Sequence, residues 1–567
     1  MTTPTLPRDL RGRICRDKEL NYNKVSTDRQ VRTAREILKR FRKNGNVLLA
    51  DDVGTGKTTV AVLVALCYAA AGMRVKIIVP NRILQASWIE KMWALAKHMN
   101  VDGKRQIKTT AVKMMKGTIL VETSGKTERV RNIDLLIIDE VHRASGTASV
   151  FEKYRIPAES GDLRILCLTA TPYSIDVSKL KDLLNRIAGG ESHRFSMLLN
   201  VSRRLKDYYS TKSAAARSAT LVSIRECWVA AIDELKPHLI RHAVSDLAPE
   251  EQMLYGTVKS RSDCYVEADS CDIKLLVRAD RIMQLARKEH GGRGRRNNDP
   301  RNHVSWRMLK EELRDLEAKL VGDLLTRECV KLHHRAIRKV TDRKQIHPKM
   351  ALVVELVRDE YASEKVLIFC YHHATAQDLA LHLDKALSQG TGRATRDAWK
   401  GRGSVIAVCN KPAGDDSEIF KSNARDAMDE FNRADGARVL VTTDQLSEGV
   451  DLHKRCRVLI HYELSPSPVR VLQRNGRVRR INSWAKETGK CVEILYPCFK
   501  GSRDERLVRI IRDRLENFDA ILGGIEARIT DEFLDIDQVN AADELRKTLN
   551  GLKDVAKSPF AVTTNVE

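Results

Sequence analysis

The chain has 567 residues, which is too long for a single hydrophobic core and therefore predicts several domains. Lys and Arg total 99 against 75 Asp and Glu, a formal net charge of +24, which indicates a polyanionic partner, with nucleic acid the leading candidate. No run approaches the roughly 18 apolar residues of a membrane span, and the N-terminus has no apolar signal core, so we expect a cytoplasmic protein without a membrane anchor. The 12 cysteines include no CxxC pair, so we expect no zinc knuckle.

The first predicted functional element is LLADDVGTGKTTVA, residues 48–61, where an apolar run breaks into glycines, lysine and threonine and then resumes. This pattern predicts a strand, a tight loop and a helix that together cradle phosphates. Glycine lets successive N–H groups turn toward phosphate oxygens at a helix N-terminus. Lys57 would contact the β and γ phosphates, and the Thr58 hydroxyl would bind Mg²⁺. Asp51 stands where the strict pattern has glycine, so a glycine-rich turn that merely carries a lysine remains an alternative.

The second element is NIDLLIIDEVHRAS, in which the apolar strand Leu135 to Ile138 ends in acidic residues. Carboxylates at the carboxyl end of a buried strand are costly unless they have a task, although ordinary loop entry is an alternative. Asp139 would hold Mg²⁺ through water, and Glu140 would orient and deprotonate the attacking water. Together with the Lys57 loop, this element predicts a nucleoside triphosphate site, with ATP and Mg²⁺ as the expected cofactors. The loop residues expected to bind the nucleotide are Asp52, Val53, Gly54, Thr55, Gly56, Lys57, Thr58 and Thr59.

Residues 190–345 lose the strand pattern, and we predict that they are helical. Within SWRMLKEELRDLEAKLVGDLL, leucines recur at three- and four-residue intervals and predict a core-facing stripe: Leu309, Leu313, Leu316, Leu320 and Leu324. The preceding RKEHGGRGRRNNDPRNH predicts an exposed basic loop. Its arginines either contact phosphates or belong to a solvated, disordered loop: Arg293, Arg295, Arg296 and Arg301. A second basic stretch, HHRAIRKVTDRKQIH, is a candidate for the groove between two lobes, and its paired histidines do not favour a metal site.

Further strand patterns occur in RILCLTATPYS, KVLIFCYHHATAQDLA and ARVLVTTDQLSEGVDL, each an apolar strand that ends in a polar loop. The last two lead into a helix or turn, as in parallel α/β sheets, so two such sheets are predicted. In content and order, these stretches and VLQRNGRVRRINSW resemble the motifs of superfamily 2 helicases and translocases. Asp139-Glu140-Val141-His142 resembles the DExH box, and residues 473–480 resemble the QxxGRxxR motif.

The resemblance is closest to Swi/Snf-type ATPases and, within them, to bacterial helicase-related proteins. DDVGTGKT is similar to their phosphate loop, and SEGVDL, IHYELSPSP, QRNGRVRR and FKGSRDERLVRIIRDR are similar to their later motifs. Pro466 and Ser467, with Asn482 and Ser483, depart from that pattern and bear on the contacts that close the lobes.

The fold that the resemblance implies is α/β, with two RecA-like parallel-sheet lobes, a helical insertion between them and a helical C-terminal tail. The expected boundaries are an N-terminal extension (1–24), lobe 1 (25–190), the insertion with its basic loop (191–345), lobe 2 (346–500) and the tail (501–567).

The resemblance also implies roles for individual residues. Gln30 would read adenine, and Gly449 and Asp451 would bind nucleotide from lobe 2. The residues implied to couple hydrolysis to movement are His142, Thr169, Ala170 and Thr171. The implied nucleic-acid contacts beyond the basic loop are Arg82 and Thr443.

Three residues of the last motif, Gln473, Arg477 and Arg480, are implied to be catalytic. The two arginines are three positions apart on a predicted helix and would share one face, where they could reach the γ-phosphate when the lobes close. A basic solvated helix is the alternative, which suits Arg474 and Arg479.

The expected function is an ATP-driven motor that translocates on double-stranded DNA, in a bacterial defence or DNA-processing system whose nuclease or other subunits are separate chains. A strand-separating helicase acting on DNA or RNA is an alternative. A third reading, from a different class, is an ATP-gated, nucleic-acid-sensing subunit of a defence or restriction complex.

Overall fold

The structure is a computed structural model, and it divides into two compact units. Unit 1 contains residues 1–252 and 515–567, and unit 2 contains residues 253–514. The structure describes residues 3–20, 22–43, 45–99, 107–108, 119–124, 133–141, 163–170, 177–188, 195–210, 214–244, 247–261, 264–267, 270–289, 304–318, 323–341, 346–388, 405–410, 418–446, 452–465, 468–500, 502, 504–509 and 511.

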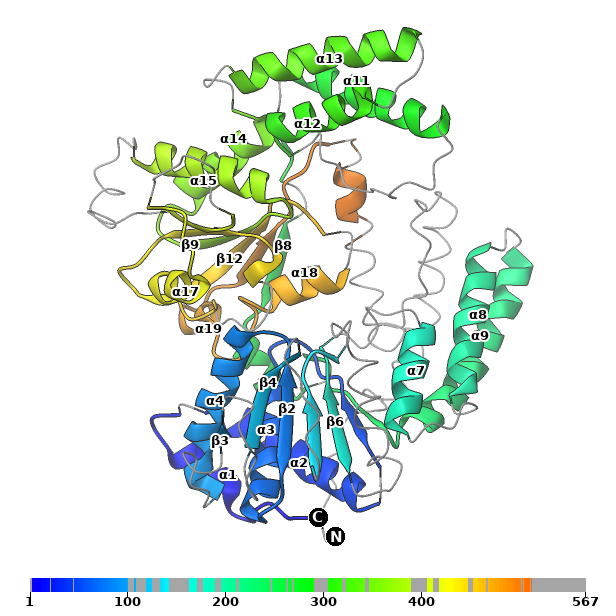
Figure 1. The fold of residues 1–567 in the computed structure, drawn as a ribbon, viewed down its shortest axis with the longest axis vertical. Helices are drawn as coiled ribbons and strands as arrows, with labels where there is room; N and C mark the ends of the chain where they lie inside the picture. Colours follow the sequence, from blue (N-terminus) through cyan, green and yellow to red (C-terminus); the bar gives the residue numbers. More distant parts are fainter. Residues whose placement is uncertain are drawn as a thin grey trace. The chain divides into compact units, whose positions relative to one another are not determined.

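The described strands of unit 1 form one parallel sheet in the order β3-β4-β2-β5-β6-β1-β7 (Figure 1). These strands are β1 (Val47–Leu49), β2 (Val75–Val79), β3 (Ile107–Lys108), β4 (Ile119–Thr123), β5 (Leu135–Ile138), β6 (Arg164–Leu168) and β7 (Leu239–Ile240). Nearly continuous apolar runs such as Leu135–Ile138 suit strands that are buried on both faces, as in parallel sheets. Leu49 pairs with Leu168 on one side and with Ile240 on the other, so β1 lies between β6 and β7.

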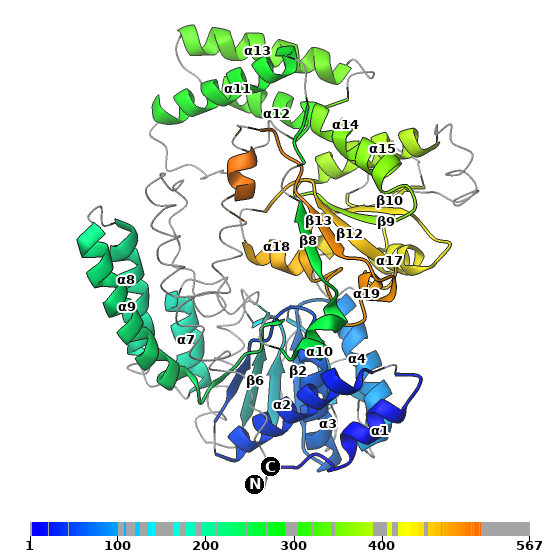
Figure 2. The same cartoon turned by 180° about the vertical axis from the view of Figure 1, so that it is seen from behind.

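Helices from the first hundred residues cover one face of this sheet. Side chains of α1 to α4 pack against alternate strand residues, among them Val75, Ile77 and Val79, and Figure 2 shows α1, α2 and α3 in front of the strands. Asn23 caps α2 by accepting a hydrogen bond from the Val25 N–H at 2.8 Å. The helices of unit 1 are α1 (Leu10–Arg16), α2 (Lys24–Arg42), α3 (Lys57–Ala70), α4 (Arg82–Ala96), α7 (Val177–Ile187), α8 (Ser196–Ser210), α9 (Ala214–Leu235) and α10 (Pro249–Gln252), with a 3₁₀ turn at Lys97–Met99.

The described strands of unit 2 form a second parallel sheet in the order β10-β11-β9-β12-β13-β8. They are β8 (Val258–Arg261), β9 (Lys365–Phe369), β10 (Val405–Val408), β11 (Val439–Thr442), β12 (Cys456–His461) and β13 (Val492–Leu495). The helices are α11 (Ser270–Glu289), α12 (Trp306–Glu317), α13 (Asp323–Thr341), α14 (Pro348–Glu355), α15 (His373–Ser388), α17 (Ala424–Asn432), α18 (Pro468–Asn475) and α19 (Trp484–Glu487), with shorter turns at Met253–Tyr255, Leu356–Glu360 and Asp444–Leu446. Two parallel sheets flanked by helices confirm the predicted α/β fold.

The helices α11, α12 and α13 form their own apolar cluster within unit 2. Leu275, Leu309, Leu313 and Leu332 are buried in it, and Phe499 packs against it. Figure 1 shows these three helices side by side.

The prediction that residues 190–345 are helical is wrong in one respect. The segment contains β7 and β8, which join the sheets of unit 1 and unit 2; strands of two and four residues are too short to give a recognisable pattern. The core-facing leucine stripe is confirmed at Leu309 and Leu313, which are buried, and it spans two helices, because α12 ends at Glu317 and α13 begins at Asp323. Leu320 lies outside the described residues. In the part of the chain that the structure describes, no helix is long and apolar enough to cross a membrane.

Candidate active site

The phosphate loop joins β1 to α3, as predicted from its sequence. Gly54 and Gly56 have φ angles of 84° and 94°, in the left-handed region that favours glycine. A Cβ atom on Gly56 would lie 2.2 Å from Nε2 of Gln30, so a side chain there would displace the Gln30 amide. Within the loop, Thr55 donates its hydroxyl hydrogen to the Asp52 carbonyl at 2.7 Å. Backbone shape and packing therefore both account for the glycines of the motif.

Lys57 is the first residue of α3, and its ammonium group lies within the loop. Nζ donates hydrogen bonds to the carbonyls of Asp51 at 2.7 Å and Asp52 at 2.9 Å. Burial lowers the pKa of Lys57, while Glu140 and Asp51 act in the opposite direction. A half-buried ammonium at the N-terminus of a helix fits the binding of a triphosphate.

Asp51, which replaces the glycine of the strict motif, is a fully buried anchor. Its Oδ1 accepts hydrogen bonds from the His242 backbone N–H at 2.9 Å and from the His242 ring, whose Nδ1 lies at 2.8 Å. Arg29 forms an ion pair with Oδ2 at 3.4 Å. Burial alone would raise the pKa of Asp51, but His242, Arg29 and Lys57 outweigh it and lower the pKa. The departure from the motif thus has a structural role.

Gln30, the residue that the resemblance implies as the adenine reader, lies beside the same loop. It is buried, and its Nε2 donates a hydrogen bond to the Thr55 carbonyl at 3.2 Å. Its Oε1 is buried without a hydrogen-bond partner among the described residues. A buried acceptor without a partner fits a ligand that brings a donor, as the amino group of adenine does.

The predicted carboxylates follow β5 at the same edge of the sheet. Asp139 Oδ2 accepts a hydrogen bond from Trp88 Nε1 at 2.8 Å, and Oδ1 accepts one from the Glu140 N–H at 3.0 Å. Burial, followed by the neighbouring Glu140, raises the pKa of Asp139 to about 7, although Trp88 and Lys57 act to lower it. A carboxyl group with a raised pKa beside a half-buried lysine is typical of a functional site.

The order β5-β6-β1 places three motifs at the carboxyl ends of adjacent strands. The Thr169 N–H, just after β6, donates to the Leu49 carbonyl of β1 at 3.1 Å, and both Thr169 and Ala170 are buried. The structure therefore brings together the loop, the carboxylates and the first half of the coupling motif, at the edge where parallel sheets bind ligands.

Several predicted site residues lie outside the described residues: His142, Thr171, Gly449, Asp451, Arg293, Arg295, Arg296 and Arg301. Of the other implied nucleic-acid contacts, Arg82 is exposed at the first position of α4, whereas Thr443 is buried.

In the last motif, the predicted helix is shorter than expected. Helix α18 ends at Asn475, so Arg477 and Arg480 follow it in turns and do not share a helical face. Gly476 marks the end, and the Arg477 N–H bonds back to the Arg474 carbonyl at 3.0 Å in a tighter turn. Gln473 is buried, and the Arg477 guanidinium donates from Nε to the Gln473 carbonyl at 3.0 Å.

Arg474, which we considered as part of a solvated face, is fully buried. It donates hydrogen bonds to the Glu463 carbonyl at 2.7 Å and the Cys370 carbonyl at 3.2 Å, and it pairs with Asp444 at 2.7 Å. Its guanidinium also lies over the Phe369 ring. The prediction of a solvated Arg474 is wrong because these oxygens supply the partners that a buried guanidinium requires.

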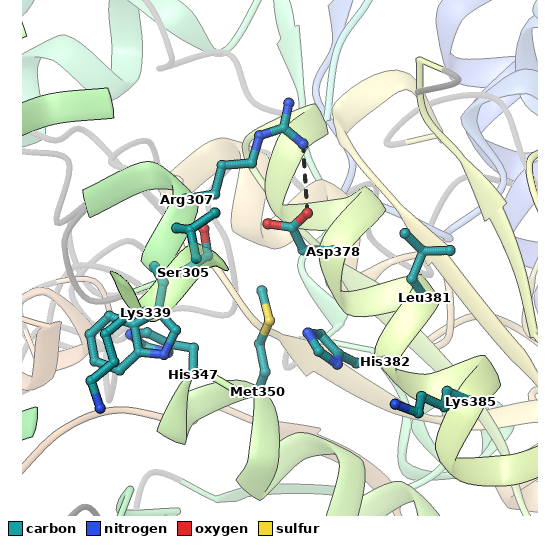
Figure 3. Close-up of a pocket in the computed structure, with 11 residues that line it drawn as sticks. Ser305, Arg307, Lys339, His347, Met350, Asp378, Leu381, His382 and Lys385 are labelled. Carbon is teal, nitrogen blue, oxygen red and sulfur yellow. Dashed lines mark ion pairs between the residues drawn. The ribbon is translucent and has the colours of Figure 1, made fainter. Parts of the chain in front are cut away.

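A separate pocket of about 310 Å³ lies in unit 2, among α12, α13, α14 and α15 (Figure 3). Figure 3 shows Arg307 pointing toward Asp378, to which it pairs at 3.6 Å. Lys339 pairs with Asp272 at 2.6 Å. None of the predicted nucleotide-binding residues lines this pocket, so it is not the predicted nucleotide site.

Comparison with protein families gives two matches. Residues 27–180 match the DEAD/DEAH box helicase family, and residues 348–482 match the helicase conserved C-terminal domain. The first contains the phosphate loop and the carboxylates, and the second contains α18 and most of the last motif.

Curated relatives agree with these matches. The chain is 22% identical over 510 residues to an uncharacterized ATP-dependent helicase, YqhH, of Bacillus subtilis, covering 88% of this chain and 80% of that one. It is 24% identical to a putative ATP-dependent RNA helicase of Methanocaldococcus jannaschii, covering 85% of this chain and 59% of the relative. It is 25% identical to the RNA polymerase-associated protein RapA of Haemophilus influenzae, covering 84% of this chain and 46% of the relative.

Among solved structures, the chain is similar to the Pyrococcus furiosus Hef helicase domain, with a TM-score of 0.43, 16% identity and coverage of 82% of this chain and 95% of that one. It is also similar to S. cerevisiae Dbp5 bound to RNA and ADP BeF3, with a TM-score of 0.46, 14% identity and coverage of 96% and 98%. On the strength of the two matched helicase domains and the helicase relatives, the chain belongs to superfamily 2 of the helicases, which are ATP-dependent nucleic-acid motors.

Proposed function

We propose that this chain is a DNA-stimulated ATPase that translocates along double-stranded DNA. The observation that carries the ATPase is the convergence of the Lys57 loop, Asp139 and Glu140 at one edge of a parallel sheet. The preference for duplex DNA rests on the Swi/Snf-like loop DDVGTGKT and on the net charge of +24.

Each residue of the site has a role in this proposal. The N–H groups of residues 54–58 and the Lys57 ammonium bind the phosphates, and Thr58 with Asp139 holds Mg²⁺. Bound MgATP supplies the phosphoryl group whose transfer to water releases free energy. Glu140 orients the attacking water and accepts its proton, because it is the carboxylate next to the metal-binding aspartate.

The arginines after α18 stabilise the transferring phosphoryl group when the two units close, and Gln473 positions them. Thr169, Ala170 and the rest of the coupling motif transmit hydrolysis to movement along nucleic acid. The proposed setting is the cytoplasm of a bacterium, in a DNA-processing or defence system whose nuclease would be a separate chain.

Strand separation is the second candidate, because the relatives include proteins named as DNA and RNA helicases. A triplex-displacement assay beside a fork-unwinding assay distinguishes the two. A translocase displaces the third strand and leaves the fork paired, whereas a helicase opens the fork. ATP hydrolysis that duplex DNA does not stimulate, with neither assay positive, would contradict both.

A further inference from the structure

The segment after β7 continues alongside the phosphate loop. Beyond the paired strands, the Asp52 N–H donates to the His242 carbonyl at 3.0 Å. The Asp52 carboxylate accepts from Arg241 at 3.0 Å and from the Val244 N–H at 2.9 Å, and Arg241 also donates to the Ala50 carbonyl at 2.9 Å. With the His242 bonds to Asp51, both aspartates of the loop are held by residues 241–244.

A second contact joins the end of this segment to the middle of the loop. Glu251 in α10 accepts a hydrogen bond from Arg29 Nε at 2.8 Å, and both side chains are buried. The other end of the same guanidinium donates to the Thr55 carbonyl at 2.6 Å. Because a guanidinium is planar and rigid, a shift of Glu251 would be passed to Thr55, which precedes Gly56, the N-cap of α3.

The segment that makes these contacts lies in unit 1, directly before unit 2 in the sequence. Residues 241–244 and 247–252 are the last described residues of unit 1 before unit 2 begins at Met253. We propose that this connector positions the phosphate loop through Arg29, Arg241, His242 and Glu251, and so links the nucleotide affinity of unit 1 to nucleic-acid engagement by the whole chain. Glu251 is a positioning residue, since it acts on the loop through Arg29.

A coupling role and a purely structural role for the ion pair between Glu251 and Arg29 lead to different effects on ATP binding. A structural pair that merely stabilises the loop would, when removed, weaken ATP binding equally with and without nucleic acid. If the connector links the loop to nucleic-acid binding, replacing Glu251 would remove the difference between the ATP affinity measured with nucleic acid and the ATP affinity measured without it. The logarithm of the ratio of the two dissociation constants, multiplied by RT, gives the coupling free energy, and by linkage the nucleotide alters nucleic-acid affinity by the same factor.

The test is a titration of the full chain with a fluorescent, non-hydrolysable ATP analogue, with and without duplex DNA. Typical coupling is about 5-fold to 150-fold. We expect Glu251→Ala to reduce the ratio to less than about 2-fold, and Glu251→Gln, which keeps the shape of the side chain, to lower it part of the way. Glu250→Ala is the matched control, because Glu250 is exposed on the same helix.

An unchanged ratio in a folded Glu251→Gln or Glu251→Ala protein, checked by thermal melting, would overturn the proposal. So would a loss of the same size in Glu250→Ala. The proposal rests on the proposed function, and the failures of the two can be distinguished. A ratio of one in the unmodified chain contradicts the coupling of ATP binding to nucleic-acid binding. A ratio above one that is unchanged when Glu251 is replaced contradicts only the role of the connector.

A double-mutant cycle tests whether Glu251 acts through Arg29. With Arg29→Lys as the second change, the double variant should have the same ratio as Arg29→Lys alone. Additive losses would show that Glu251 acts by another route and would contradict the relay.

Discussion

Glu140, the proposed general base, has an unusual backbone conformation. Its φ of 46° lies in the left-handed region, which costs roughly 1 kcal/mol or more for a residue with a side chain. In the turn that it makes directly after β5, its N–H donates a hydrogen bond to Asp139 Oδ1 at 3.0 Å. Backbone strain of this kind is commonly found at functional sites.

Glu140→Gln should therefore retain ATP and Mg²⁺ binding and lose nearly all turnover, because the amide cannot accept a proton from water. Lys57→Ala is the contrasting change and should weaken nucleotide binding itself. Equilibrium binding and steady-state hydrolysis, measured on both variants, separate the two effects. Normal turnover in Glu140→Gln would remove this residue from its role as the base.

The hydrogen bond from Trp88 gives a pH-dependent prediction for Asp139. The bond favours the ionised carboxylate, and its loss in Trp88→Phe should raise the pKa of Asp139 above about 7. Since the proposed Mg²⁺ ligand must be ionised, activity is lost as the pH falls through this pKa. The acid limb of the pH profile of kcat/KM should accordingly move to higher pH.

Trp93→Phe is the control for that experiment, because Trp93 lies on the same helix α4 and is 50% exposed. Its pH profile should match that of the unmodified protein. A Trp88→Phe profile that does not move, or that moves to lower pH, would show that Asp139 does not set the acid limb.

The short helix α18 contains a buried arginine with several partners. Arg474 is fully buried and satisfies two backbone carbonyls as well as Asp444, so its removal leaves these oxygens without their donor. Arg470, on the same helix, pairs with the same Asp444 at 2.9 Å but is about half exposed. The two arginines differ in burial rather than in charge.

We expect Arg474→Ala to lower the free energy of unfolding by about 3 kcal/mol, the size seen when one partner of a buried pair is removed. Arg470→Ala should lower it by less than about 1 kcal/mol. Denaturant unfolding, followed by a probe in unit 2, measures both. Equal losses would mean that the contacts of Arg474 with the two carbonyls contribute little to stability.

Elements with a strong local signal were predictable from the sequence, and elements fixed by distant partners were not. The strand, loop and helix around Lys57 are encoded in 14 consecutive residues, and the structure forms all three. In contrast, β7 has two residues and exists because it pairs with β1, which no local pattern reveals. The end of α18 was missed because two arginines three positions apart suggest a continuous helix, whereas the helix ends at Asn475.

Across the whole molecule, the predicted nucleotide site also combines residues that local patterns identify with residues that only distant contacts reveal. The residues of the phosphate loop and the two carboxylates are grouped in motifs that local spacing identifies, whereas Gln30 was assigned only through the family resemblance. The residues that hold those motifs lie far away in sequence: His242 is 191 positions from Asp51, and Glu251 is 222 positions from Arg29. The substitution of glycine by Asp51 was the one local sign that the loop has an additional partner.

The last prediction concerns the arginines that follow α18. Arg477 is 5% exposed and bonds to the Gln473 carbonyl of its own unit, whereas Arg480 is only half-buried. If Arg480 acts on the transferring phosphoryl group, Arg480→Ala should leave nucleotide affinity within a few fold and remove on the order of 10³ of the DNA-stimulated rate. Basal and stimulated rates should then converge while the melting temperature stays close to that of the unmodified protein.

Arg477→Ala should instead lower the melting temperature, because it removes a buried side chain with a backbone partner. Stimulated turnover close to normal in both variants would mean that neither arginine acts on the phosphoryl group and that the catalytic positive charge comes from another residue.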